Sequence, residues 1–161
     1  WTSNDFRPRD KKGARAALNL PPDKVIALNV GSCALNKNLQ LLQAISRALS
    51  DEVLTVQIGG GSAAASRPSG YHQVVEQVPP QTLPLYYNAA DLYVATSTAE
   101  GFCFPVIEAV NSGLPVIASP IDTFSETLRG SPVYREVIRI GGLDRSHFAS
   151  DRASSPLESG Q

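Results

Sequence analysis

The sequence predicts an α/β fold in which helices cover both faces of a parallel β-sheet. Continuous apolar runs, typical of strands buried on both faces, alternate with segments whose apolar residues recur at helical spacing. Glycine-containing or polar stretches separate them. With 161 residues, 42% hydrophobic and 18% charged, the chain has the size and composition of one ordinary globular domain.

The first half of the chain predicts two strands and two helices. Four apolar residues between Leu39 and Leu49 recur at helical spacing, which indicates an amphipathic helix. The second strand ends at three consecutive glycines, Gly59–Gly61. The expected elements are a short helix over 11–18, a buried strand over 25–30, a helix over 37–50 and a strand over 53–58.

The second half continues the alternation. Pro105 suits the first turn of a helix, where its missing N–H is not needed. Gly113 suits the residue just past that helix, where a left-handed conformation is common. The other expected elements are a short strand over 72–78, a helix over 82–88, strands over 91–95 and 114–118, and a helix over 123–128.

The two ends of the chain differ from the middle. Residues 1–9 are polar and irregular, and residues 144–161 are rich in Ser, Asp and Arg, which is typical of a disordered tail. Residues 133–140 are compatible with one more strand. We therefore expect a linker remnant over 1–9, one domain over 10–143 and a tail over 144–161. The absence of any methionine suggests a piece of a longer protein.

Glu100 and Glu108 are the strongest candidates for chemistry. They lie eight positions apart, one in the loop after the strand over 91–95 and one a turn inside the helix that this loop opens. A helix N-terminus presents free backbone N–H groups and the positive end of a dipole, so it is suited to bind an anion. An anion site beside two carboxylates is what a sugar linked to a nucleotide needs: donors for phosphate and acceptors for hydroxyls.

Four segments resemble one family of enzymes. The stretch from Ala95 to Ser119 is similar to the donor-site signature of retaining glycosyltransferases of family 4. Residues 30–39, 56–61 and 83–92 are similar to other segments of that family, in the same order. The resemblance covers about residues 6–126. It implies a Rossmann-like parallel sheet with helices on both faces, a single half of a GT-B fold, and specifically the C-terminal, donor-binding half.

The resemblance also implies roles for individual residues. Glu108 would accept hydrogen bonds from both ribose hydroxyls of the donor, and Glu100 would be the catalytic residue that faces the donor sugar. The substrate-binding set would include the loop between them, where backbone N–H groups meet sugar and phosphate oxygens: Gly101, Phe102, Cys103 and Phe104. For a lone glutamate without the resemblance, an exposed residue that complements the helix dipole is the simpler interpretation.

The phosphates would meet residues from the earlier loops. Lys37 is the expected diphosphate contact, and Ser32 and Gly60 complete the predicted substrate-binding set. Two positions depart from the family: Ser32 stands where many members have arginine, and Cys103 where glycine is usual. Ser32 cannot supply the charge-assisted bond of an arginine, which is worth roughly 1.5–3 kcal/mol.

Since all these loops follow strands of one parallel sheet, they should converge on one edge, near the point where the strand order reverses. Other residues are assigned no role in the site. His72 and His147 have no partner at the spacing of a metal or nucleophile site, and Tyr86 and Tyr87 are expected to pack in the core.

Composition narrows the classes of function. The net charge of −1 gives no reason to expect nucleic acid as a partner, and neither a membrane-spanning run nor a signal peptide is present. Cys33 and Cys103 are too few for a disulfide framework, which favours a cytoplasmic setting. Membrane association would arise only through an absent half or a lipid acceptor.

We therefore expect a glycosyltransferase domain whose substrate is a nucleotide-sugar, such as a UDP- or GDP-sugar, with no cofactor and no metal. The acceptor would bind to a missing N-terminal domain, so that this chain alone transfers no sugar. The alternatives are another GT-B enzyme, such as a phosphorylase or a sucrose-synthase-like protein, and a non-catalytic module that only binds sugar nucleotides.

Overall fold

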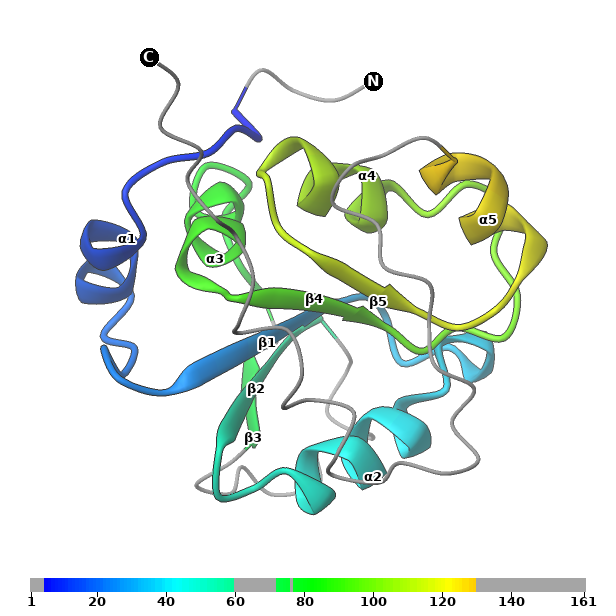
Figure 1. Cartoon of the computed structure of the whole chain (residues 1–161), viewed down its shortest axis with the longest axis horizontal. Coiled ribbons are helices and arrows are strands. Elements are labelled where there is room, and N and C mark those ends of the chain that lie inside the picture. Colours follow the sequence, from blue (N-terminus) through cyan, green and yellow to red (C-terminus); the bar gives the residue numbers. More distant parts are fainter. Residues whose placement is uncertain (1–4, 60–71, 76, 130–161) are drawn as a thin grey trace, which may run out of the picture.

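A single parallel sheet organises the chain. The computed structural model describes residues 5–59, 72–75 and 77–129 (Figure 1). The described elements, in chain order, are α1 (Lys11–Ala17), β1 (Val25–Val30), the 3₁₀ turn η1 (Leu35–Lys37), α2 (Leu39–Ala48), β2 (Val53–Ile58), β3 (His72–Val75), α3 (Leu83–Ala89), β4 (Leu92–Ala95), α4 (Phe104–Asn111), β5 (Val116–Ala118) and α5 (Asp122–Leu128). The five strands pair in the order β3-β2-β1-β4-β5, and every pair is parallel.

Helices cover both faces of the sheet, so the predicted α/β class is confirmed. Successive side chains of a strand point to opposite faces. In β1, Ile26 and Leu28 belong to the large core cluster with residues of α3, α4 and α5, whereas Ala27 packs with Leu42 of α2. Figure 1 shows the same layers, with α2 below the sheet and α3, α4 and α5 above it.

A partly buried ion pair fixes the first helix to the sheet. Arg15 of α1 is 7% exposed, and its guanidinium donates to Asp91 Oδ2 at 2.6 Å. The same carboxylate oxygen accepts the backbone N–H of Ile26 at 2.8 Å. Asp91 therefore ties α1 and the start of β1 to the residue that precedes β4, and it has a structural role.

The structure shortens some predicted elements and divides one. The helix expected over 37–50 begins at Leu39, because Asn38 adopts a left-handed conformation (φ 48°) between η1 and α2. Pro105 lies in the first turn of α4, and Gly113 past its end has φ 73°, as predicted. The third strand is shorter than expected, His72–Val75. The predictions for residues 1–4, 60–71 and 130–161 lie outside the described residues.

The strand order reverses between β1 and β4, and we call the region outside the carboxyl ends of these two strands the crevice. The chain runs outward from β1 through β2 to β3 and returns to β4 on the other side of β1. β1 and β4 are therefore neighbours whose following loops lead in opposite directions, the arrangement at which open α/β sheets bind ligands. The loops after these two strands contain most of the candidate residues.

Candidate functional site

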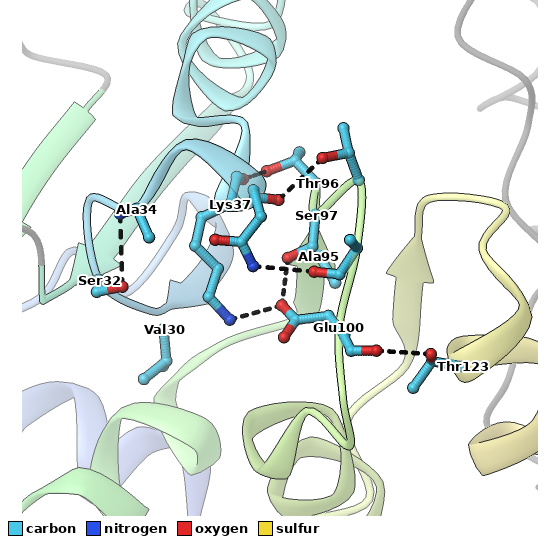
Figure 2. Close-up of polar contacts among 12 residues, drawn as sticks. Val30, Ser32, Ala34, Lys37, Ala95, Thr96, Ser97, Glu100 and Thr123 are labelled. Atoms are coloured by element: carbon cyan, nitrogen blue, oxygen red, sulfur yellow. Dashed lines mark hydrogen bonds and ion pairs between the residues drawn. The ribbon is translucent and has the colours of Figure 1, made fainter.

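An ion pair joins the loops that follow β1 and β4. Lys37 at the end of η1 donates from Nζ to Glu100 Oε1 at 2.5 Å (Figure 2). Ser97 Oγ donates to the same oxygen at 2.6 Å. The side chains of Lys37 and Glu100 are 21% and 8% exposed, so both charges are largely withdrawn from water. Two residues that are 63 positions apart in sequence thus meet at the crevice.

Polar contacts hold these loops in place on both sides of the pair. The contacts join the loop of Lys37 to the loop of Glu100, and the latter to α5. They are Thr98 N to Asn36 O (2.8 Å), Asn36 Nδ2 to Ala99 O (2.9 Å), Thr96 Oγ1 to Lys37 O (2.8 Å) and Thr123 Oγ1 to Glu100 O (2.8 Å). The site is therefore held by interactions that need no ligand.

Glu108 lies one turn inside α4, as the sequence predicts, but it is not the exposed dipole-complementing residue of the simpler interpretation. Its side chain is half-buried, and the Tyr87 hydroxyl donates to its Oε2 at 2.7 Å. Burial raises the pKa of Glu108, and the hydrogen bond from Tyr87 opposes that rise. Among the described residues no cation pairs with Glu108.

Tyr93 of β4 is a buried residue near both glutamates. It is 1% exposed, and its hydroxyl donates to Val30 O at 3.2 Å. Burial is the largest cause of the raised pKa of Tyr93, and the charges of Cys103, Glu108 and Glu100 raise it further. The Tyr93 phenol is therefore a common neighbour of Glu100 and Glu108.

Cys103 occupies a position that favours glycine. It precedes α4 with φ 51°, in the left-handed region that side chains disfavour, and it is 8% exposed. Burial, followed by the nearby Glu100 carboxylate, raises the pKa of the Cys103 thiol to about 11. The thiol is therefore neutral at physiological pH and is a poor nucleophile.

The surroundings of Gly59 and Gly101, two glycines of the loops, differ. Gly59 has φ 82°, and a Cβ there would lie 2.5 Å from the carbonyl oxygen of Gly31. The ends of β1 and β2 therefore touch through backbone alone. At Gly101, in contrast, a Cβ would meet nothing within 4 Å. No packing within the described chain explains Gly101, and the space beside it is open to a ligand. Gly60 lies outside the described residues.

The remaining predicted residues lie on the surface around the crevice. Ser32 is exposed, and its Oγ accepts only a long contact, 3.5 Å, from the Ala34 N–H. Phe102 and Phe104 are 51% and 47% exposed, and their rings meet edge to face with centroids 5.1 Å apart. The two rings therefore form a small exposed aromatic pair at the start of α4.

Sequence reasoning missed three side chains that shape the site. Ser97 and Thr123 hold the carboxylate and the backbone carbonyl of Glu100, and Tyr87 holds Glu108. Tyr87 packs in the core, as expected, but its hydroxyl reaches the site. The run Thr96-Ser97-Thr98 at the end of a buried strand was a signal for polar contacts, whereas nothing in the sequence connects Tyr87 with Glu108.

Two kinds of site are not found in the described part of the chain. No group of three or more His, Cys, Asp or Glu side chains in it could hold a metal ion. None of its helices has the length and apolarity needed to cross a membrane.

The chain belongs to the glycosyl transferases group 1 family, whose model matches residues 10–130. The fold agrees: 77% of the chain superimposes on 34% of sucrose-phosphate synthase from Thermosynechococcus elongatus, with a TM-score of 0.65 and 30% identity. The architecture is therefore a Rossmann-like half of a GT-B fold, as expected from the sequence.

Two further proteins are similar to this chain. A putative teichuronic acid biosynthesis glycosyltransferase, TuaC of Bacillus subtilis, is 34% identical over 111 residues, which are 69% of this chain and 28% of that protein. The C-terminal domain of a glycosyl transferase group 1 protein, LpcC of Francisella tularensis, shares the fold: TM-score 0.57, 21% identity, 70% of this chain and 67% of that domain. The chain spans only about a third of the length of the curated relatives it matches.

Proposed function

We propose that this chain is the donor-binding, C-terminal half of a retaining family 4 glycosyltransferase that moves a sugar from a nucleotide diphosphate to an acceptor hydroxyl. The observation that carries the proposal is the meeting of Lys37 and Glu100 at the crevice between β1 and β4, beside the N-terminus of α4. One cation, one carboxylate and the positive end of the α4 dipole at a strand-order reversal match a sugar diphosphate.

The diphosphate would bind between Lys37 and the N-terminus of α4. Phosphate oxygens accept charge-assisted hydrogen bonds from an ammonium group and from the first N–H groups of a helix. In the free protein the Lys37 ammonium is already paired with Glu100. A bound diphosphate would compete for that ammonium and release one carboxylate oxygen of Glu100.

The released Glu100 carboxylate would then serve the donor sugar. It would accept hydrogen bonds from the sugar hydroxyls. Its negative charge would stabilise the positive charge that develops at the anomeric carbon as the bond to phosphate breaks. The side chain of Glu100 is only 8% exposed, so little water screens this interaction. Gly101 leaves open space beside it.

The ribose would bind at Glu108. A half-buried carboxylate without a cationic partner is an unfavourable arrangement unless hydrogen-bond donors reach it. Tyr87 supplies one donor, at Oε2. The two hydroxyls of a ribose supply the others and can be held by the remaining lone pairs.

The acceptor site would lie on a second, N-terminal domain across the crevice. The relatives are about three times as long as the stretch they share with this chain, and the LpcC structure, which has the same fold, is described as a C-terminal domain. Exposed Phe102 and Phe104 beside the site are suited to such a partner surface. The proposed enzyme is cytoplasmic, uses no cofactor or metal ion, and reaches a membrane only through its acceptor or its other half.

A non-catalytic module that binds sugar nucleotides is the second candidate. Ser32 favours it, because it is exposed and supplies no positive charge to the diphosphate. The site would then bind donor weakly and serve regulation or delivery rather than transfer.

Ligand-detected NMR against UDP-, GDP- and ADP-sugars tests the proposal. We expect selective binding of one nucleotide class with a dissociation constant of roughly 0.1–1 mM for half a site. Glu108→Gln should abolish it, whereas Glu126→Gln, an exposed carboxylate on α5, should not. Binding to none of the three by the full-length parent would contradict the proposal. Binding by that parent without transfer to any acceptor would favour the non-catalytic module.

A further inference from the structure

Tyr87 connects the aromatic core to the proposed ribose site. It belongs to α3, whereas Glu108 belongs to α4, and the Tyr87 hydroxyl donates to Glu108 Oε2 at 2.7 Å. The ring of Tyr87 is 1% exposed. The hydroxyl is thus the one part of this buried side chain that reaches a site residue.

Aromatic neighbours determine where that hydroxyl lies. The ring of Phe6 packs edge-on against Tyr87 with centroids 5.3 Å apart and an interplanar angle of 89°. The ring of Tyr93 stacks on it at 6.0 Å and 17°. A ring held by two others has little freedom to turn or shift. The donor of the hydrogen bond is therefore fixed before any ligand binds.

The bond affects both the geometry and the charge of Glu108. It engages Oε2 and leaves Oε1 for a ligand. The only described side chain that forms a hydrogen bond with this carboxylate is neutral, so the bond orients the group without neutralising it. The ionisable groups around it are Tyr87 from α3 and Tyr93 from β4. Burial raises the pKa of Glu108, and the bond from Tyr87 opposes this.

We propose that Tyr87 is the positioning residue that makes this site selective for ribose over deoxyribose: it holds the Glu108 carboxylate turned so that it accepts the vicinal hydroxyls of a nucleoside diphosphate. The proposal rests on the ribose role of Glu108 given above. A carboxylate that is free to rotate loses rotational entropy when a ligand binds. A second ribose hydroxyl would therefore add less binding free energy.

Tyr87→Phe removes only the hydroxyl, and Tyr86→Phe is a matched control. Tyr86 is the neighbouring residue on α3, it is half-buried, and no described hydrogen bond involves its hydroxyl. Both variants keep an aromatic ring in place. A thermal melt of each variant measures any loss of packing separately from the effect on the site.

The first readout compares each of UDP, GDP and ADP with its 2′-deoxy counterpart. The native chain should prefer the ribonucleotide, and Tyr87→Phe should weaken ribonucleotide binding by about tenfold while it changes deoxyribonucleotide binding much less. Tyr86→Phe should keep the native ratio. An unchanged ratio in Tyr87→Phe overturns the positioning role, as does an equal loss for both nucleotides.

The second readout needs no ligand. In a ¹³C NMR titration of the Glu108 carboxyl, Tyr87→Phe should shift its pKa upward and Tyr86→Phe should not; a native pKa in Tyr87→Phe would overturn the proposal. If that shift occurs but neither the native chain nor its full-length parent binds any of these nucleotides, the ribose role of Glu108 fails, and the selectivity proposed for Tyr87 fails with it. Failure of the proposed function is thus distinguished from failure of the hydrogen bond.

Discussion

Lys37 and Glu100 neutralise each other across the crevice between β1 and β4. The Lys37 Nζ lies 2.5 Å from Glu100 Oε1, and both side chains are mostly buried. The two charges of this pair are therefore compensated without a ligand. Any diphosphate that binds to Lys37 has to replace a carboxylate that already accepts from Ser97 as well. The pair thus holds a lysine and a glutamate close together without a ligand.

Removal of either charge should destabilise the fold more than removal of both. Lys37→Met leaves the Glu100 carboxylate with Ser97 alone, and we expect it to lower the free energy of unfolding by roughly 2 kcal/mol. Glu100→Gln in the same background should recover about half of that loss. Urea denaturation of the two single variants and the double variant measures this coupling. Lys12→Met, at an exposed lysine of α1, is the control. Additive losses would mean that the pair contributes nothing.

Two glycines of the site should respond in opposite ways to alanine. Gly59→Ala places a Cβ 2.5 Å from Gly31 O at φ 82°, so it should cost roughly 2–3 kcal/mol of stability. Gly101→Ala meets nothing within 4 Å, so stability should change by less than about 0.5 kcal/mol. The added methyl should nevertheless weaken nucleotide-sugar binding. Native-like stability of Gly59→Ala in urea would show that the β1 and β2 ends do not touch as described.

Glycine should stabilise the folded chain more than alanine does at position 103. Both substitutions remove the thiol, and they differ only in the Cβ at φ 51°. In a helix or strand interior alanine is the more stable of the two by about 0.5–1 kcal/mol. At Cys103 we expect the reverse, with Cys103→Gly more stable than Cys103→Ala by about 1 kcal/mol in chemical denaturation. Greater stability of the alanine variant would argue against the left-handed conformation.

The buried carboxyl of Glu108 should make stability depend on pH. Its pKa is raised above the ordinary 4.5, mainly by burial, so the folded state prefers the protonated form. The resulting stabilisation is complete below the ordinary pKa and is lost as pH rises through the higher folded pKa. Glu108→Gln, which is neutral at every pH, should therefore gain stability relative to the native chain across this window.

Denaturation of both proteins in a pH series measures the difference. Glu126→Gln, at an exposed residue of α5, is the control: it measures the effect of removing one surface carboxylate on stability. If the difference between Glu108→Gln and the native chain is independent of pH, or decreases as pH rises, burial of Glu108 is not what determines its ionisation.

Most of the fold could be predicted from local patterns. β1 and β2 are rich in apolar residues because both faces of these strands are buried. Pro105 and Gly113 marked the two ends of α4 because each has a backbone conformation that suits that place. The exception is Asn38, which interrupts the predicted helix over 37–50. Asparagine tolerates the left-handed region better than most residues do. The spacing of apolar residues, however, does not predict where such a conformation will interrupt a helix.

The contacts within the site could not be predicted, because they depend on which strands are neighbours. Lys37 meets Glu100 because β1 and β4 are neighbours in the sheet, which brings the loops after these two strands together. The hydrogen bond from Tyr87 to Glu108 likewise depends on how α3 and α4 pack on the same face of the sheet. The sequence therefore predicts the candidate residues and the edge at which they gather, and the structure adds their partners.

Amide chemical-shift mapping during titration with the selected nucleotide-sugar tests the central claim most directly. If the crevice between β1 and β4 binds the donor, the largest shifts will fall on residues 31–37 and 100–104 and on Glu108, while α1 and the C-terminal part of α2 stay unchanged. Lys37→Met should abolish these shifts. Saturable binding with its largest shifts elsewhere on the chain, or shifts that persist in Lys37→Met, would contradict the account.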